Sequence, residues 1–269
     1  MTGLAIGVMG VGGRMGGMVV RQVGATEGCA IVAGGEHPDS SALETDIGTL
    51  AGLPPLGVVA TADRKAVFAA SDVVVDFTLP ESTVANAAEA NASGTAMVIG
   101  TTGLSNEQEE QLRAAAKTAP IVYAPNMSLG VNLLFALVKR VAATLDEDFD
   151  IEVVEMHHNR KVDAPSGTAL GLGRAAAAGR SVPFDDVAVL SREGHTGART
   201  RGEIGFATLR GGDVVGDHTV VFAGPGERIE LTHKAAGREL FASGAVRAAL
   251  WTPGRAPGLY SMADVLGLD

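Results

Sequence analysis

The sequence predicts an α/β protein built from a doubly wound parallel sheet and a second α+β domain with a mixed or antiparallel sheet. Three observations support this. The first half alternates short, continuously apolar runs with helical segments, the order found in parallel sheets with helices on both faces. A glycine-rich loop directly follows the first apolar run. Beyond residue 128, polar residues interrupt the apolar runs, which is typical of a sheet with one exposed face.

Five apolar runs of the first half are predicted to be buried parallel strands because they do not alternate with polar residues. They span 4–9, 29–34, 73–77, 96–99 and 121–124. The segments between them predict helices at 14–23, 64–70, 81–92 and 106–117. The last helix has the clearest start, because Ser105 can cap it and the acidic residues within 107–110 favour the positive end of its dipole.

The pattern changes near residue 128, where a second domain is predicted to begin. Helices are expected at 129–145, 166–178 and 238–250, and strands at 151–157, 187–191, 204–209, 218–222 and 228–232. The chain then enters a tail rich in proline and glycine at 252–258, followed by a final apolar turn.

Composition excludes several classes of protein. A chain of 269 residues with 46% hydrophobic content can bury a substantial core. The formal net charge of −10 argues against nonspecific nucleic-acid binding. Cys29 is the single cysteine, so no internal disulfide forms, and its apolar setting favours a buried filler. We expect a cytoplasmic protein with no membrane partner, because no segment resembles a signal peptide or approaches the ~20 apolar residues that span a bilayer.

The first motif that indicates ligand binding is the run at 7–16, Gly-Val-Met-Gly-Val-Gly-Gly-Arg-Met-Gly. It follows a strand and opens a helix, so its backbone can approach a pyrophosphate, and the helix N-terminus supplies N–H groups. Met15 occupies the third glycine position of the strict G-x-G-x-x-G pattern, and G-x-x-G-x-x-G at 10, 13 and 16 fits better. The alternative is a tight turn without a ligand.

Glu36 lies about twenty residues beyond this loop, after the second strand, where it can accept hydrogen bonds from the ribose hydroxyls of a dinucleotide. Strand, loop, helix, strand and acid together indicate a Rossmann-type domain, although Glu36 alone could be a solvated loop acid. His37 stands where an arginine would hold the 2′-phosphate of NADP, and histidine is only partly charged near neutral pH. We therefore expect NADH to be used at least as efficiently as NADPH.

Two further turns follow the fourth and fifth strands, with the sequences Gly100-Thr101-Thr102-Gly103 and Ala124-Pro125-Asn126-Met127. Both lie at the carboxyl ends of predicted parallel strands, where ligands bind in open α/β sheets. Their backbone groups could face the nicotinamide and its ribose. Ordinary turns would look much the same.

Residues 155–168, Glu-Met-His-His-Asn-Arg-Lys-Val-Asp-Ala-Pro-Ser-Gly-Thr, concentrate polar chemistry in a mostly apolar chain. Asp163 or Ser166 can cap the helix that starts here, so the N–H groups of Gly167 and Thr168 form a site for a carboxylate.

The same run places His157 and His158 at the end of an apolar strand. Neighbours on a strand point to opposite faces, so at most one of the two approaches a given atom unless the strand breaks there. Lys161 adds a fixed positive charge and a possible proton donor. The alternatives are a solvated basic loop and a histidine metal site, but adjacent histidines lack the i, i+4 spacing of common metal pairs and no cysteines complete a set, so we expect no metal.

With these motifs the chain resembles the 4-hydroxy-tetrahydrodipicolinate reductase (dihydrodipicolinate reductase) family over essentially its full length. Arg160 is a departure, because some relatives carry a further histidine there. The resemblance is carried by Gly-Arg-Met-Gly at 13–16, Phe77-Thr78, Gly-Thr-Thr-Gly at 100–103, Ala-Pro-Asn-Met-Ser at 124–128, the His-His…Lys-Val-Asp-Ala-Pro-Ser-Gly-Thr-Ala run at 157–169, and Gly-Ala-Val-Arg-Ala-Ala-Leu-Trp at 244–251.

The resemblance implies a role for each site residue. His157 is implied to be the acid–base residue and Lys161 a proton donor, while His158, Gly167 and Thr168 hold the substrate carboxylates. The residues implied to contact NADH or NADPH are Gly10, Val11, Gly12, Gly13, Arg14, Met15, Glu36, His37, Gly100, Thr101, Thr102, Ala124, Pro125, Asn126 and Met127.

The resemblance also implies an activity and an organisation. The activity is the NAD(P)H-dependent reduction of 4-hydroxy-tetrahydrodipicolinate, a small dicarboxylate, with loss of water, in lysine biosynthesis through diaminopimelate. A dinucleotide-binding domain at 1–128 is implied to be completed by 240–269, with a substrate-binding and oligomerisation domain at 129–239 that assembles a homotetramer through its sheets.

The chemistry of such a reduction suits the basic run. Hydride arriving at C4 of a conjugated cyclic imine pushes electrons toward the ring nitrogen, so a cationic acid stabilises the developing enamine and protonates it. His157 or Lys161 would supply that proton. Two alternatives stay open: another two-domain amino-acid-pathway dehydrogenase, such as an aspartate dehydrogenase, which should lack the full central run, and a nonenzymatic dinucleotide sensor, which would need no paired acids.

Overall fold

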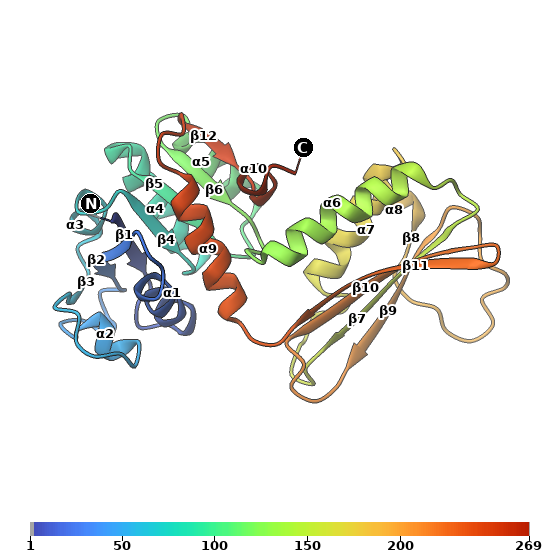
Figure 1. Ribbon diagram of the computed structural model, residues 1–269, viewed down its shortest axis with the longest axis horizontal. Helices are drawn as coiled ribbons and strands as arrows, with labels where there is room; N and C mark the ends of the chain where they lie inside the picture. Colours follow the sequence, from blue (N-terminus) through green and yellow to red (C-terminus); the bar gives the residue numbers. More distant parts are fainter. Residues whose placement is uncertain (1–2, 269) are drawn as a thin grey trace. The chain divides into compact units, whose positions relative to one another are not determined.

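The computed structural model describes residues 3–268, which divide into two compact units (Figure 1). The first unit runs as far as Ser128 and resumes at Glu239–Gly267, and the second comprises Leu129–Arg238. Each unit has its own sheet. Along residues 3–268 no helix combines the length and apolar character needed to cross a membrane.

The first unit is built on a seven-stranded sheet in the order β12-β6-β5-β4-β1-β2-β3, with every neighbouring pair parallel. Its strands are β1 (Leu4–Met9), β2 (Cys29–Gly35), β3 (Ala60–Thr61), β4 (Val73–Asp76), β5 (Ala96–Ile99), β6 (Pro120–Tyr123) and β12 (Gly258–Tyr260). Its helices are α1 (Arg14–Gly24), α2 (Ile47–Leu50), α3 (Arg64–Ala69), α4 (Pro80–Ser93), α5 (Asn106–Ala115), α9 (Glu239–Trp251) and α10 (Met262–Leu266).

The strand order reverses between β1 and β4, and this position fixes where a ligand can enter. After β1 the chain moves outward through β2 and β3, then returns to place β4, β5 and β6 on the other side. In doubly wound sheets the crevice at the carboxyl ends of the strands on either side of this reversal receives the ligand. The loops after β1, β2 and β4 therefore surround the candidate nucleotide position.

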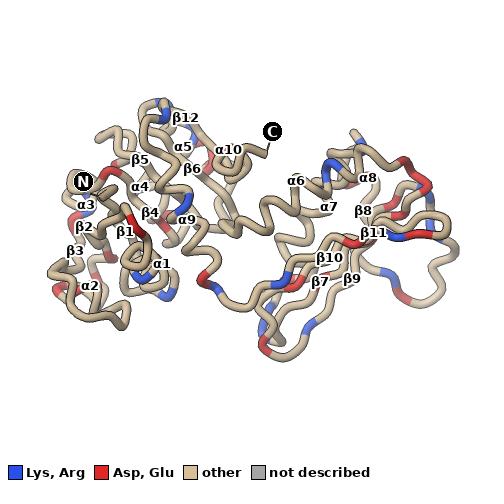
Figure 2. The backbone as a smooth tube through the Cα atoms, in the orientation of Figure 1, with Lys and Arg blue, Asp and Glu red and all other residues tan. Residues whose placement is uncertain are grey.

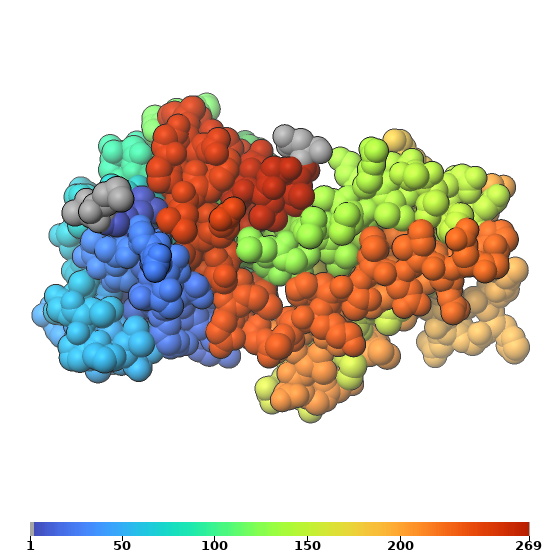
Figure 3. Space-filling model, viewed as in Figure 1, coloured from blue at the N-terminus to red at the C-terminus, as the bar shows by residue number. Residues whose placement is uncertain are grey.

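The central strands of this sheet are buried because helices cover both faces. Every residue of β4 and β5 is buried, as expected for continuously apolar strands. Helices α1 and α9 pack together on one face, while α3, α4 and α5 pack in sequence along the other. Figure 3 shows atoms of the C-terminal segment, coloured orange to red, covering part of the first unit's surface.

The second unit carries a five-stranded mixed sheet in the order β11-β10-β7-β9-β8. The strands are β7 (Asp150–His157), β8 (Ala188–Val189), β9 (Ile204–Arg210), β10 (Gly216–Gly224) and β11 (Glu227–Ala235), and the helices are α6 (Leu129–Thr144), α7 (Gly167–Gly179) and α8 (Phe184–Val187). Strand β7 lies parallel to β9 and antiparallel to β10, which makes the sheet mixed.

Burial alternates along β7, with Ile151, Val153, Glu155 and His157 buried and the residues between them partly exposed. The buried apolar positions pack against α6 and α7, which cover one face of the sheet. Glu155 and His157 therefore belong to the covered face, directly beyond the apolar part of the core.

The predicted fold class is confirmed, and several element predictions need correction. The strand expected at 187–191 is the end of α8 followed by β8, and the strand expected at 228–232 is longer, as β11. The final apolar turn is helix α10, and the preceding tail leads into β12. Helix α2 and strand β3 were not predicted. Elements of two to five residues contain too few residues to show a period, which explains these omissions.

Candidate active site

The loop between β1 and α1 has the shape that its glycines permit. Gly10 has a φ of +73°, a conformation that side chains rarely adopt. The N–H of Gly13 donates to the carbonyl oxygen of Gly10 at 2.9 Å. A Cβ atom added to Gly16 would lie 2.0 Å from that same carbonyl oxygen. The glycine spacing at 10, 13 and 16 thus has a steric cause, because helix α1 begins in direct contact with the turn.

The carboxylate of Glu36 lies against this loop. Its Oε2 accepts from the N–H of Gly12 at 2.7 Å, and its Oε1 accepts from the N–H of His37 at 2.9 Å. A Cβ atom on Gly12 would approach Glu36 Oε2 to 2.9 Å. The glycine loop and the acid therefore form one continuous cradle, whose open backbone fits a dinucleotide.

A cavity of about 350 Å³ adjoins the cradle within the first unit. Arg14 and Val11 do not line it, since Arg14 is exposed at the start of α1 and the Val11 side chain is buried in the core. The lining residues are Met9, Gly10, Gly13, Glu36, His37, Pro38, Ala62, Arg64, Phe77, Thr78, Leu79, Ser82 and Asn86.

His37 lies on the rim of this cavity and is directed partly to solvent. Its side chain is 64% exposed, and its Nδ1 accepts from the N–H of Asp39 at 3.2 Å. The same Nδ1 lies 3.7 Å from Oδ2 of Asp39, so contacts within its own turn orient the ring.

The two later turns are held by backbone contacts. The N–H of Gly100 donates to the carbonyl oxygen of Asp76 at 2.9 Å, and that of Ala124 to the carbonyl oxygen of Ile99 at 3.1 Å. A Cβ atom on Gly100 would lie 2.1 Å from the ring of Phe77, and one on Gly244 of α9 would lie 1.7 Å from the carbonyl oxygen of Met127. Close packing thus fixes the course of both turns at the carboxyl edge of the sheet.

The side chains of these turns are turned inward where they are buried. Thr101 is 3% exposed, and its Oγ1 accepts from the hydroxyl of Thr83 at 2.7 Å. Met127 is 1% exposed. Any contribution of Thr101 and Met127 to a ligand therefore comes from the backbone.

In the second unit, the buried carboxylate of Glu155 joins three elements. Its Oε2 lies 2.5 Å from Nδ1 of His157, and its Oε1 accepts from the N–H of Ser166 at 3.0 Å. Arg210, at the end of β9, donates to both carboxylate oxygens at 2.9 and 3.0 Å. Burial alone would raise the pKa of Glu155, but hydrogen bonds from His157, Arg210 and Ser166 lower it to about 2. Glu155 is therefore an anion surrounded by donors.

His157 is held from several sides. Besides Glu155 at Nδ1, its ring meets the ring of His218 edge to face, with centroids 5.0 Å apart. A Cβ atom on Gly216 would lie 2.9 Å from Nε2 of His157, so the glycine leaves room beside that nitrogen. His157 is 8% exposed. Its ring orientation is thus determined by the protein.

His158 and Lys161 follow directly after the end of β7 and are more accessible. The N–H of His158 donates to the carbonyl oxygen of Val214, and the Lys161 ammonium lies 2.8 Å from Asp163 Oδ1. Burial lowers the pKa of His158, and the charges of Arg160 and Arg238 lower it further. The strand ends at His157, so the alternation of strand side chains does not extend to His158.

Helix α7 begins beside this cluster. Ser166 is its N-cap, and the Ser166 hydroxyl oxygen accepts from the N–H of Ala169 at 3.1 Å. Gly167 has open space around it, since an added Cβ atom would meet nothing within 4 Å. The predicted cap and helix start are both present, and Glu155 ties the cap to the histidine strand.

Glu155, Arg210 and His218 had no role in the sequence interpretation. Glu155 precedes His157 by two residues on a strand, so the period of two could have placed both on one face. Arg210 and His218 come from other strands, and nothing local to them indicates this partnership. Among residues 3–268, no group of three or more His, Cys, Asp or Glu side chains is arranged to hold a metal ion.

Comparison with known proteins matches both units of the chain to one family. The family model described as "Dihydrodipicolinate reductase, N-terminus" matches residues 4–127, and "Dihydrodipicolinate reductase, C-terminus" matches residues 130–266. A 4-hydroxy-tetrahydrodipicolinate reductase of Rhodopseudomonas palustris (strain BisB18) is 57% identical over 269 residues, covering 100% of this chain and 99% of the relative. One of Magnetococcus marinus is 51% identical, covering 98% of each chain.

Solved structures show the same fold. A dipicolinate-bound dihydrodipicolinate reductase from Paenisporosarcina sp. TG-14 has a TM-score of 0.77 at 24% identity, covering 97% of this chain and 98% of that one. An aspartate dehydrogenase from Thermotoga maritima has a TM-score of 0.51 at 12% identity, covering 94% and 98%. The likeness to the aspartate dehydrogenase is limited to the fold.

The buried His218 predicts a pH dependence of stability. Burial, reinforced by the charge of His157, lowers the pKa of His218 from 6.5 to about 4. Between these values the unfolded chain binds the proton and the folded chain does not, so stability falls as the pH drops from 6.5 to 4, by at most about 3 kcal/mol from this residue. Urea unfolding across this range should show a smaller loss in His218→Gln. The exposed His195→Gln is the control, and equal pH dependence in wild type and His218→Gln would contradict the assignment.

Proposed function

The chain belongs to the dihydrodipicolinate reductase family, and on that premise we propose that it is a 4-hydroxy-tetrahydrodipicolinate reductase. It is an NAD(P)H-dependent oxidoreductase of the diaminopimelate route to lysine. The observation that carries the proposal is the full-length 57% identity to a relative with this activity. The cluster formed by the end of β7 and the start of α7 supports it, because a helix N-terminus beside several cations suits a dicarboxylate.

The first unit is assigned the cofactor. The bound dinucleotide supplies a hydride to the substrate when it is present. The open backbone of 10–15 takes the pyrophosphate, because the glycines allow close approach at the start of α1. Glu36, which now accepts two N–H groups, accepts the ribose hydroxyls. The turns at 100–102 and 124–127 present backbone groups at the nicotinamide side.

The second unit is assigned the dicarboxylate. The N–H groups at the start of α7, at Gly167 and Thr168, receive one carboxylate. His158 assists as a hydrogen-bond donor, and its Nδ1 is buried without a partner among the described residues. Neighbouring cations disfavour the charged form of His158. A bound dianion offsets this repulsion, so substrate and basic cluster stabilise each other.

Proton supply is assigned to His157 and Lys161. The Glu155 carboxylate holds Nδ1 of His157 at 2.5 Å and so fixes the orientation of the ring. Gly216 leaves space at Nε2, the nitrogen from which a proton can leave. Lys161 lies next to the same segment, with its Nζ 2.8 Å from Asp163 Oδ1. Either residue can donate a proton to the ring nitrogen on which electrons accumulate as the enamine forms.

Removal of either proton donor should abolish most of the activity without lowering the affinity for NADH. We expect His157→Ala and Lys161→Ala to lower kcat by about 10²–10⁴-fold, the usual contribution of a positioned acid. The assay is NADH oxidation dependent on freshly made hydroxytetrahydrodipicolinate, with NADH affinity measured separately. The exposed His195→Ala and Lys139→Ala serve as controls. Unchanged activity in both test variants would refute the catalytic assignment.

Cofactor choice follows from Glu36 and His37. A carboxylate that accepts ribose hydroxyls favours NADH, and the histidine at position 37 lacks the fixed positive charge with which an arginine would attract a 2′-phosphate. We expect kcat/KM with NADH at least equal to that with NADPH. Steady-state kinetics with both cofactors at saturating substrate checks this. A strong preference for NADPH would overturn it.

We also propose that the protein acts in the cytoplasm as a homotetramer assembled through the second unit's sheet. Helices α6 and α7 cover one face of this sheet. On the other face Val154 and Val221 are only partly buried, and Leu209 is 50% exposed. The segment between β8 and β9 covers the end of this face at Glu152, to which Arg192 and Arg199 donate. The apolar residues beyond Glu152 stay accessible, which suits a self-association surface.

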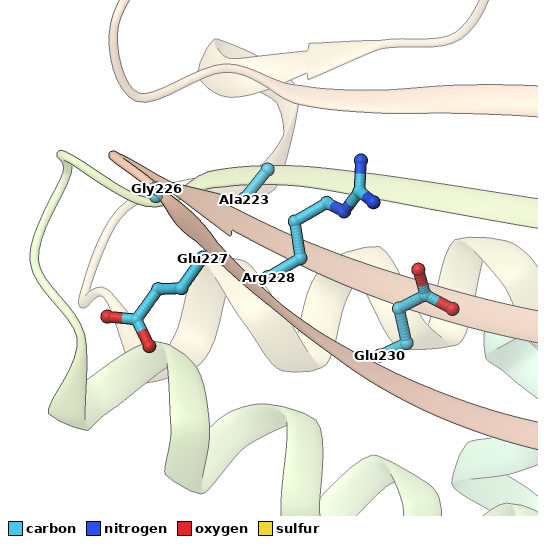
Figure 4. A pocket seen from close by; sticks show the side chains of 6 residues that line it. Ala223, Gly226, Glu227, Arg228 and Glu230 are labelled. Carbon is cyan, nitrogen blue, oxygen red and sulfur yellow. The ribbon is translucent and has the colours of Figure 1, made fainter.

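The same face is charged at one end. A hollow of about 760 Å³ lies at the β10–β11 hairpin, where Arg228 and Glu230 project away from the helices and Glu227 projects the other way (Figure 4). Lys and Arg are interspersed with Asp and Glu in this unit (Figure 2). Because Ala223 of the hairpin pairs with Asp150 at the start of β7, the hollow lies at the opposite end of that strand from His157.

A charge placed in the middle of the uncovered face should weaken assembly. We expect Val154→Asp to shift the protein from tetramer toward smaller species, because burying an unpaired carboxylate costs several kcal/mol. Sedimentation velocity measures the change. Leu137→Asp, on an exposed position of α6, is the matched control. A monomeric wild-type protein would contradict the proposed assembly.

A further inference from the structure

The cavity beside the glycine loop contains one side chain with a permanent positive charge. Among the described residues that line it, Glu36 is acidic, His37 is titratable, and Arg64 alone is cationic at every physiological pH. Arg64 is partly exposed and begins helix α3. The cofactor assignment above gives it no role.

Arg64 and Glu36 follow adjacent parallel strands. Gly35 of β2 pairs with Thr61 of β3, and the N–H of Glu36 donates to the carbonyl oxygen of Thr61 at 2.9 Å. Both side chains therefore start from the same carboxyl edge of the sheet. The two side chains line the same cavity. A ribose that binds to Glu36 would therefore lie in the cavity that Arg64 also lines.

A buried chain of hydrogen bonds orients the guanidinium of Arg64. Its Nε–H donates to Oδ1 of Asn86 at 2.6 Å, and Nδ2 of Asn86 donates to Oδ2 of Asp76 at 2.9 Å. Asn86 and Asp76 are both 0% exposed. Within residues 3–268, neither terminal amine of Arg64 has a hydrogen-bond or ion-pair partner. One edge of the guanidinium is anchored, and the other two nitrogens are available to a ligand.

The other polar side chains of the cavity offer a phosphate no fixed positive charge. Thr78, Ser82 and Asn86 are neutral, and Glu36 is acidic. The carboxylate of Glu36 repels a phosphate, and a histidine such as His37 lacks the permanent charge of an arginine. A ribose with a free 2′-hydroxyl needs only Glu36. A ribose with a 2′-phosphate needs a compensating cation, and a planar guanidinium matches a phosphate with two parallel hydrogen bonds.

We propose that Arg64 binds the 2′-phosphate of NADPH and thereby determines how well this enzyme accepts the phosphorylated cofactor. The inference rests on the proposed dinucleotide site of the first unit. NADH and NADPH share the glycine loop, whereas Glu36 favours the free hydroxyl and Arg64 favours the phosphate. An arginine near the ribose acid accommodates a 2′-phosphate by this chemistry.

The test uses adenosine 2′,5′-bisphosphate and 5′-AMP, which differ by the 2′-phosphate alone. Isothermal titration gives the two dissociation constants for the wild type, Arg64→Gln, Arg64→Lys and the control Lys65→Gln, whose side chain is exposed and does not line the cavity. We expect Arg64→Gln to weaken the bisphosphate by about ten- to a hundredfold, the usual effect of losing a charged hydrogen bond, and 5′-AMP by less than about twofold. Arg64→Lys should recover part of the loss.

The ratio of the two constants within each variant decides the outcome, because partial unfolding lowers the apparent affinity for both ligands equally. If Arg64→Gln weakened the binding of both ligands equally, Arg64 would act on the part that they share or through the Asn86–Asp76 hydrogen bonds, and the proposal would be overturned. No change in either dissociation constant would also overturn it. A matching rise in KM for NADPH, with KM for NADH unchanged, is the kinetic counterpart. Because the titration needs no substrate, an enzyme inactive on hydroxytetrahydrodipicolinate would contradict the proposed function and leave this test intact.

Discussion

The buried carboxylate of Glu155 is the interaction on which the second unit's site depends. A buried anion is tolerated only when it is paired and hydrogen-bonded on all sides. Glu155 meets this requirement with donors from three elements: His157 on its own strand, Ser166 at the start of α7, and Arg210 at the end of β9. Because one charge needs all three, the histidine, the helix start and the sheet end are held in one geometry.

That requirement explains how an acidic protein holds a basic cluster. The chain has a formal net charge of −10, yet residues 157–161 contribute two histidines, an arginine and a lysine within five positions. On the buried side of the cluster Glu155 contacts Nδ1 of His157, and Asp163 pairs with the ammonium of Lys161. The positive charge that remains lies near the N-terminus of α7, the position proposed above for the dicarboxylate.

The periodicity of apolar residues and the positions of glycines made much of this structure predictable. Side-chain contacts between strands that are distant in the sequence were not predictable. The first-unit strands were readable because a strand covered on both faces is apolar throughout, and the loop at 10–16 because Gly10 and Gly16 answer a steric need. The cap at Ser166 was readable from local chemistry. Arg210 and His218 reach Glu155 and His157 only through the registers of β9 and β10 with β7, which no local pattern states. Arg64 was hidden for the same reason, since its cavity is created by the pairing of β2 with β3.

The two units share one hydrogen-bonding arrangement, which is easily exchanged in the first unit and rigid in the second. In each, a carboxylate after or within a strand accepts a backbone N–H from the turn that opens a helix: Glu36 from Gly12 before α1, and Glu155 from Ser166 before α7. Glu36 is partly exposed and held only by backbone N–H groups, so a ligand hydroxyl can share or replace those bonds at little cost. Glu155 is 1% exposed and held by an arginine at both oxygens, so exchanging a partner would strand a buried charge. Under the roles proposed above, the first acid is therefore suited to bind a cofactor that must leave after each turnover, and the second to keep His157 in one orientation throughout the cycle.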